Sequence, residues 1–230
     1  MRRLIFITAI CAMLGGTVFA DLRLQIGYEG SAYGPYQTGR GGEFTVLSIG
    51  WSPLAYYEDS VKNIGVTGTF QTFCIESLET INGYPSTYEV FLSDAAVYGS
   101  NYPNSDPLSI GTAYLYHEFQ NGTLNDYQSR TPTKIAELQN AIWYLEGEGG
   151  SLSTNYANML IAKFDSVDNA INTIANGAYG VKVMNLWDVG SVGVSGHQHQ
   201  DLLVCVPAPA AVLLGMLGLG VAGVKLRKYT

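Results

Sequence analysis

The order in which two hydrophobic periods follow one another along the chain most constrains its fold. Segments near both ends alternate or are rich in β-branched and aromatic residues, which predicts strands. Between them, hydrophobic residues recur at helical spacing. We therefore expect an α+β chain, in which an antiparallel β barrel or sandwich body carries an inserted helical subdomain at about 107–177. The expected strands are residues 22–28, 43–49, 68–76, 88–92, 180–188 and 202–206.

Three helices are expected inside this insertion. The first follows Asp106-Pro107 and ends at Asn121-Gly122. The second begins at Thr131-Pro132, because Thr is a good N-cap and Pro suits the first helical position. The third has a hydrophobic stripe over residues 153–176 and ends before Gly177.

Composition and charge limit the size and the partners of the domain. The chain has 230 residues, of which 47% are hydrophobic, and this suits one domain with appendages. All 19 Asp and Glu lie between Asp21 and Asp201, where they face only seven Lys and Arg, so this part has a net charge of −12. Such an acidic surface repels phosphate backbones, and we expect no nucleic-acid partner. The domain is predicted to span residues 21–205.

The first 20 residues are typical of a signal peptide. Arg2 and Arg3 precede a short apolar run, and a small residue, Ala20, stands before the expected cleavage site. A buried N-terminal helix is the alternative, but the run has no amphipathic period. The mature chain would then keep two cysteines, Cys74 and Cys205.

The last 25 residues predict a second targeting segment. Residues 206–224 carry no charged or hydrogen-bonding side chain, and their 19 residues approach the ~20 that cross a bilayer as a helix. Lys225, Arg227 and Lys228 follow directly, and positive charge favours the cytoplasmic side, so the domain would face outward. A plain tail anchor would satisfy the same pattern.

The tail resembles the bacterial PEP-CTERM sorting signal. Val206, Pro207, Ala208 and Pro209 correspond to its short motif, with Ala208 in place of the usual Glu, and the apolar run and basic end follow in order. The resemblance implies a Gram-negative source and processing by an exosortase. It also implies an intermediate in the inner membrane through 206–224, and export to the outer surface or the extracellular matrix.

Two short segments could together carry chemistry. Phe73-Cys74-Ile75-Glu76 lies on an expected strand, and the segment from Leu138 to Trp143, which contains Gln139, lies on an expected helix. These segments resemble the two signature motifs of bacterial thioester domains, which are found in surface adhesins. The resemblance implies that Cys74 and Gln139 form an internal thioester, since a thiolate is a nucleophile and a side-chain amide offers a carbonyl carbon.

An internal thioester requires rigid positioning and protection from water. Orientation of sulfur and carbonyl can contribute ~7–11 kcal/mol toward the barrier. Phe73, Trp143 and Tyr144 are the candidates for excluding water. The predicted function is covalent adhesion, in which the acyl group of Gln139 moves from the sulfur of Cys74 to an amine or hydroxyl of a surface polymer, glycan or protein. Each molecule would react once, so we expect no enzyme and no cofactor.

Other readings of the two cysteines and of Gln139 remain open. An exported domain with two cysteines often forms a disulfide, here Cys74–Cys205. Cys74 could also be a buried free thiol in a non-covalent surface or matrix module. Gln139 and Trp143 could be ordinary helix residues. Gln71 is a rival amide. It lies three residues before Cys74 on the same expected strand, so its side chain should point to the opposite face.

Enzymatic and metal-binding readings have weaker support. A cysteine hydrolase needs a histidine base, for which His117 is available. His197 and His199 could form half of a metal site, but further ligands are not spaced near them. Acidic pairs occur at Glu76/Glu79 and at 146/148, without the Asp-x-Asp pattern of a calcium loop. A bound Ca²⁺ at these pairs stays open as an alternative, but we predict no metal site.

Overall fold

The computed structural model describes residues 22–27, 33–34, 36–49, 69–82, 86–97, 105–124 and 127–206. The expected signal peptide at 1–20 and the expected sorting signal beyond Val206 lie outside the described residues. Among the helices that are described, none is both long and apolar enough to cross a membrane.

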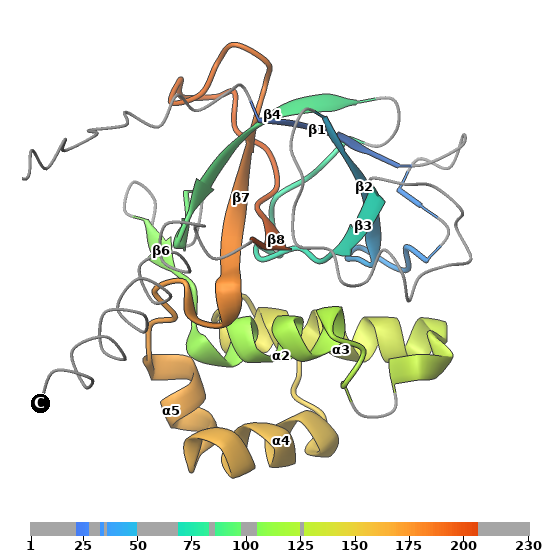
Figure 1. Cartoon of the computed structure of the whole chain (residues 1–230), viewed down its shortest axis with the longest axis vertical. Coiled ribbons are helices and arrows are strands. Elements are labelled where there is room, and N and C mark those ends of the chain that lie inside the picture. Colours follow the sequence, from blue (N-terminus) through green and yellow to red (C-terminus); the bar gives the residue numbers. More distant parts are fainter. Residues whose placement is uncertain are drawn as a thin grey trace, which may run out of the picture.

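Six strands form one antiparallel sheet in the order β3-β2-β1-β4-β7-β8 (Figure 1). Most strands that pair are also consecutive in sequence. The exceptions are β4, which pairs with β1 and not with β3, and β7, which pairs with β4 although the helices lie between them in the chain. The strands of this sheet are β1 (Arg23–Ile26), β2 (Phe44–Ile49), β3 (Thr69–Thr72), β4 (Thr87–Ser93), β7 (Val181–Trp187) and β8 (Leu202–Cys205). A separate pair consists of β5 (Ala95–Ala96) and β6 (Asp106–Pro107).

The two edges of the sheet meet just after β3. Leu203 of β8 donates its backbone N–H to the carbonyl of Phe73 (3.3 Å), and the N–H of Ile75 donates to the carbonyl of Asp201 (3.0 Å). Cys74 lies between these two bonds. The sheet is thus nearly closed into a barrel, which leaves few unpaired strand edges.

All four described α-helices lie between β6 and β7 in the chain. Figure 1 shows α2 and α3 across one end of the barrel, with α4 and α5 farther from it. The helices are α2 (Ile110–Gln120), α3 (Pro132–Leu145), α4 (Thr154–Phe164) and α5 (Val167–Asn172). Two 3₁₀ turns accompany them: η1 (Tyr127–Ser129) lies between α2 and α3, and η2 (Ala178–Gly180) lies between α5 and β7.

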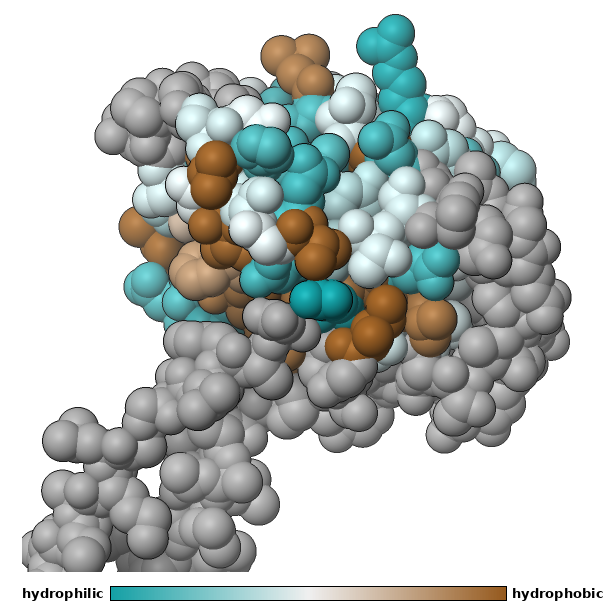
Figure 2. Space-filling model, turned by 90° about the horizontal axis from the view of Figure 1, so that it is seen from above, coloured by the Kyte–Doolittle hydropathy of each residue, from teal (hydrophilic) through white to brown (hydrophobic). Residues whose placement is uncertain are grey.

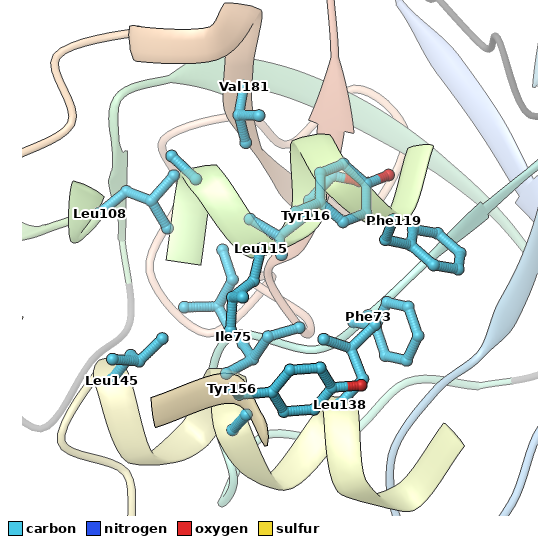
Figure 3. Packing of buried hydrophobic residues seen from close by; sticks show 14 of the residues in the cluster. Phe73, Ile75, Leu108, Leu115, Tyr116, Phe119, Leu138, Leu145, Tyr156 and Val181 are labelled. Atoms are coloured by element: carbon cyan, nitrogen blue, oxygen red, sulfur yellow. The ribbon is translucent and has the colours of Figure 1, made fainter. Parts of the chain in front are cut away.

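Buried hydrophobic residues form two clusters. The barrel cluster takes every member from strands or from Cys74; the helix cluster joins strand residues to the helices. Alternate residues of β8 enter different clusters, as the two-residue period of a strand requires. Figure 3 shows Phe73 and Ile75 of the helix cluster among side chains of α2 and α3. The barrel cluster consists of Leu24, Ile26, Phe44, Val46, Phe70, Cys74, Tyr88, Val90, Met184, Leu186, Leu202 and Val204.

The coarse prediction of fold class is confirmed, because the chain combines helices with a largely antiparallel sheet. The predicted start of α3 is also confirmed: the Thr131 side chain accepts from the N–H of Lys134, with Pro132 in the first turn. Ser109 caps α2 in the same way, by accepting from the N–H of Thr112. These caps satisfy donors that a helix N-terminus otherwise leaves without a partner.

The prediction of one continuous helix over residues 153–176 is wrong. α4 ends at Asp165, whose backbone is left-handed (φ 69°), and α5 starts afresh after Ser166. The Ser166 hydroxyl accepts from the N–H of Asn169 at 3.0 Å, as an N-cap does. The hydrophobic stripe continues through both helices, so its period alone could not reveal the break.

The barrel end opposite the helices has a mixed surface. Hydrophobic and hydrophilic residues are interspersed over the described part of this face (Figure 2). Single exposed hydrophobic residues, such as Val189, Val192 and Val194, are normal on a protein surface. A functional site is therefore better sought where polar groups are buried.

Candidate functional site

Cys74 is held where the barrel closes. It pairs with Leu202 of β8 in an isolated antiparallel bridge, and the bonds of Phe73 and Ile75 on either side fix its backbone. Its side chain belongs to the barrel cluster and is only 2% exposed. The residue therefore has a rigid backbone and a buried thiol.

The side-chain amide of Gln139 lies against the backbone of Cys74, 65 residues away in sequence. Its Nε2 donates to the carbonyl of Cys74 at 2.8 Å, and its Oε1 accepts from the Cys74 N–H at 3.1 Å. Gln139 lies in the middle of α3 and is 2% exposed. The two residues that the sequence singled out are thus neighbours, and both are buried.

A second backbone donor reaches the same amide oxygen. The N–H of Gly42 donates to Gln139 Oε1 at 2.8 Å, so this oxygen accepts from two backbone N–H groups. Paired N–H groups of this kind stabilise negative charge on a carbonyl oxygen when a nucleophile attacks its carbon. The arrangement can therefore polarise the Gln139 amide as an oxyanion hole would.

Two glycines allow the amide to sit where it does. A Cβ on Gly41 would lie 2.2 Å from Cγ and 2.7 Å from Cδ of Gln139. A Cβ on Gly42 would lie 2.7 Å from the carbonyl oxygen of Thr72. Sequence reasoning did not single out this Gly-Gly pair, although it lies in a loop rich in glycine. It becomes informative only once the loop is known to cross Gln139.

The three predicted shielding residues lie in different places. Trp143, one turn after Gln139, packs against the barrel cluster that contains Cys74. Phe73 belongs instead to the helix cluster, where its ring meets that of Phe119 edge-on at 5.1 Å between centroids. Tyr144 is 41% exposed. Of the three, only Trp143 shares a cluster with Cys74, and shielding remains a prediction.

A cavity of about 380 Å³ reaches Cys74. Arg40 and Glu79 contribute charged groups to its wall, while Tyr33 and Phe44 contribute aromatic surface. Leu78, which is 90% exposed, also borders it. A small or extended partner group therefore has space beside the cysteine.

The environment keeps the thiol protonated. Burial raises the pKa of Cys74 well above its ordinary value, and the nearby Glu79 carboxylate raises this pKa further. A protonated thiol is a weak nucleophile, so attack by the sulfur requires removal of its proton during the reaction. Glu79 borders the same cavity, and its negative charge disfavours the thiolate form of Cys74.

Neither described cysteine forms a disulfide. Cys74 and Cys205 are both free and buried, and their side chains belong to different clusters, Cys74 to the barrel cluster and Cys205 to the helix cluster. Burial raises the pKa of Cys205 to about 12. The structure therefore does not pair them, and Cys205 acts as a small hydrophobic residue in the helix cluster.

The rival amide, Gln71, lies elsewhere. Its side-chain oxygen is 3.1 Å from the hydroxyl of Thr45 on the neighbouring strand β2, and its backbone carbonyl accepts from Tyr116 and Gln120 of α2. Gln71 thus links β2, β3 and α2. None of these contacts involves Cys74.

The histidines also have other partners. His117 contacts the carbonyl of Tyr179 at 3.1 Å and the amide of Asn121 at 2.7 Å, which gives no support to a Cys74–His117 pair. His197 and His199 each contact the carboxylate of Asp188, at 2.9 and 2.8 Å. These exposed contacts tie together the loop between β7 and β8.

Comparison of the chain with models of known families, with curated proteins and with solved structures gave no match.

Proposed function

We propose that Cys74 and Gln139 condense into an internal thioester, which the protein uses for single covalent attachment to a partner. The observation that carries the proposal is the contact of the Gln139 amide with Cys74 and Gly42. This amide is fixed by three hydrogen bonds and is directed at the residue that bears the nucleophile. Such pre-orientation removes much of the entropic barrier to attack on an amide.

The reaction balances without a co-reactant. Sγ of Cys74 bonds to Cδ of Gln139, the Cδ–Nε2 bond breaks, and the thiol proton leaves with Nε2 as ammonia. The N–H groups of Gly42 and Cys74 would hold the negative charge that develops on Oε1. One such donor typically contributes ~3–4 kcal/mol to a transition state. A partner amine entering the cavity would then bond to Cδ and release the thiol.

The setting of this chemistry is also part of the proposal. The signal-like segment at 1–20 and the tail at 206–230 favour export and processing by an exosortase. The protein would pass through the inner membrane and remain on the outer surface or in the extracellular matrix. If so, Pro207→Ala with Pro209→Ala, or removal of residues 225–230, leaves the chain unprocessed in the membrane fraction. Normal processing of both variants would contradict this part.

Methylamine is the direct probe of the reactive bond. Wild-type protein treated with methylamine should gain one methylamide at Gln139 and one free thiol at Cys74, located by peptide mass mapping. Cys74→Ala and Gln139→Ala should show neither change. Cys205→Ala removes the other buried thiol and should react as wild type does. No methylamide in wild type, or equal labelling of the Cys74→Ala variant, would refute the thioester.

A second candidate function is a non-covalent surface or matrix module, and one observation favours it. Gln139 satisfies both the N–H and the carbonyl of Cys74, as a neighbouring strand would. The same contact could thus serve only to close the barrel edge against α3, with Cys74 as a structural thiol. Unmodified Gln139 and Cys74 in the methylamine experiment would support this candidate.

A further inference from the structure

A cluster of carboxylates, separate from the Cys74–Gln139 contact, lies at the junction of three segments. One side-chain oxygen each from Glu76, Asp106 and Glu148 lies within 4.8 Å of the others. Glu76 follows β3, Asp106 starts β6, and Glu148 follows α3. The spacing in sequence hides this cluster, because 30 residues separate the first two members and 42 separate the last two.

Two oxygens of this cluster are buried and accept no hydrogen bond from a described donor. Glu76 is 2% exposed, and no such donor reaches its Oε1. No such donor reaches Oε1 of Glu148 either. The carboxyl groups of Glu76 and Glu148 can hydrogen-bond to each other only when one of them carries a proton. A buried polar atom without a partner is expensive, and in a native structure it often indicates an ion or water that completes it.

The rest of Glu148 is held in place. Its Oε2 accepts from the N–H of Ser77 at 3.3 Å and from the Ser77 hydroxyl at 3.2 Å. This contact fixes the carboxylate against the segment that follows Cys74. Its other oxygen is thereby left buried and without a described donor rather than free to turn into solvent.

Further acidic groups surround the cluster. Glu148, Glu79 and Asp201 are all close enough to Glu76 to act on its carboxyl group electrostatically. The Glu79 carboxylate also accepts from the N–H of Asp201 at 3.3 Å. The repulsion must be relieved either by protons or by a cation.

We propose that Glu76, Asp106 and Glu148 bind a calcium ion. Calcium takes six to eight oxygen ligands with flexible geometry, and carboxylates from separate segments suit it. Zinc would favour His and Cys ligands, which this cluster lacks, and magnesium would keep more of its water. Backbone carbonyls and water would complete the coordination.

The ion would connect the two halves of the candidate site. Glu76 lies two residues after Cys74, and Glu148 lies nine residues after Gln139, just beyond the end of α3. A cation held between them fixes the end of the Cys74 segment to the end of the Gln139 helix. The proposal does not depend on the thioester, because its ligands and its partners are different atoms.

The test is a titration of the full chain, freed of metal by a chelator, with CaCl₂. Isothermal titration calorimetry should show saturable binding, and the melting temperature should rise with calcium concentration. Glu76→Gln and Glu148→Gln should each weaken binding by about tenfold or more, since each removes a charged ligand. Glu137→Gln, at a half-buried position of α3 where Glu137 pairs with Lys134, should bind as wild type does.

Several results would overturn the calcium site. They are absence of saturable binding, unchanged affinity in both Glu76→Gln and Glu148→Gln, or equal affinity for MgCl₂. A Glu76→Gln protein that is stabilised while wild type binds no calcium would show that the carboxylates share protons instead. The Cys74→Ala variant should keep calcium binding, so a failed thioester and a failed calcium site are distinguished.

Discussion

The side-chain amide of Gln139 pairs with the backbone of Cys74 through two hydrogen bonds, of 2.8 and 3.1 Å, as a residue on an adjacent strand would. A helix thereby completes the sheet at the point where the barrel closes. The same contact places a carboxamide against the one residue of the motif that carries a thiol. Its structural and its chemical consequences can be measured separately.

The structural consequence is a loss of stability when the amide is removed. The comparison is best made between Cys74→Ala and the double variant Cys74→Ala/Gln139→Ala. Without Cys74 no thioester can form, so the Cys74→Ala protein keeps the Gln139 side-chain amide intact. Loss of Gln139 leaves the N–H of Gly42 and both backbone groups of position 74 without a partner. We expect ~2–5 kcal/mol less free energy of unfolding by urea denaturation.

The control for this measurement is Gln198→Ala in the same Cys74→Ala background. The side chain of Gln198 accepts from the N–H of Gly196 in an exposed contact, so we expect a change below ~0.5 kcal/mol. If the Gln139 and Gln198 variants lose equal stability, the amide does not support the barrel edge.

The glycine loop makes a second prediction. Gly41→Ala puts a methyl group 2.2 Å from Gln139 Cγ and must displace either the loop or the amide. We expect a loss of ~1–3 kcal/mol of stability and no reaction with methylamine. Gly39→Asn is the matched control, because nothing lies within 4 Å of a Cβ there and Asn tolerates its positive φ. Methylamine labelling of Gly41→Ala at the wild-type level would contradict this account.

The reactivity of Cys74 provides a third prediction. In Gln139→Ala no thioester can form, and the thiol stays buried with a raised pKa. Its reaction with iodoacetamide at pH 8 should be at least about tenfold slower than that of glutathione, because little thiolate is present. Urea should abolish the difference. Rapid alkylation of the folded variant would show that the cavity leaves Cys74 open to solvent and ionised.

A fourth prediction concerns pH. Burial raises the pKa of Glu43 to about 7, although Arg130, at 2.7 Å, and Tyr127 both lower it. The folded state therefore binds this proton more tightly than the unfolded state, whose carboxyl has a pKa near 4.5. The stability that this group contributes is present below about pH 4.5 and is lost as the pH rises toward 7, at a rate of up to ~1.4 kcal/mol per pH unit.

The test of this titration is the melting temperature of wild type and Glu43→Gln between pH 5 and 8. The variant should show a smaller decline over this range, although it is less stable at pH 8 because the ion pair between Glu43 and Arg130 is lost. Glu137→Gln, at a half-buried ion pair, should follow the wild-type slope. Parallel curves for wild type and Glu43→Gln would mean that Glu43 is ionised throughout.

Local signals in the sequence predicted much of the fold. Thr131-Pro132 predicted the start of α3, and alternation predicted β1, because caps and strand periods depend on neighbouring residues. The strands β7 and β8 were also predicted, at 180–188 and 202–206. The break at Asp165 was missed because a non-glycine residue adopts the left-handed conformation there. The two-residue strands β5 and β6 exist only through each other, so no local pattern indicates them.

The candidate site was predictable in its residue types and not in its surroundings. The motifs around Cys74 and Gln139 indicated the pair, and the structure brings these residues together. The role of Gly42 depends on a contact across 97 residues, which only the folded chain creates. The meeting of Glu76 with Glu148 likewise depends on how α3 ends beside the barrel.

The mass of the intact wild-type protein, measured under non-reducing conditions at neutral pH, tests the condensation of Cys74 with Gln139 most directly. We predict a mass lower by one ammonia than the mass calculated from the mature sequence, and no such deficit in Cys74→Ala. A wild-type mass equal to the calculated value, with both thiols alkylated after unfolding, would contradict the internal bond. The Gln139 amide would then serve only to hydrogen-bond the backbone of Cys74 and Gly42.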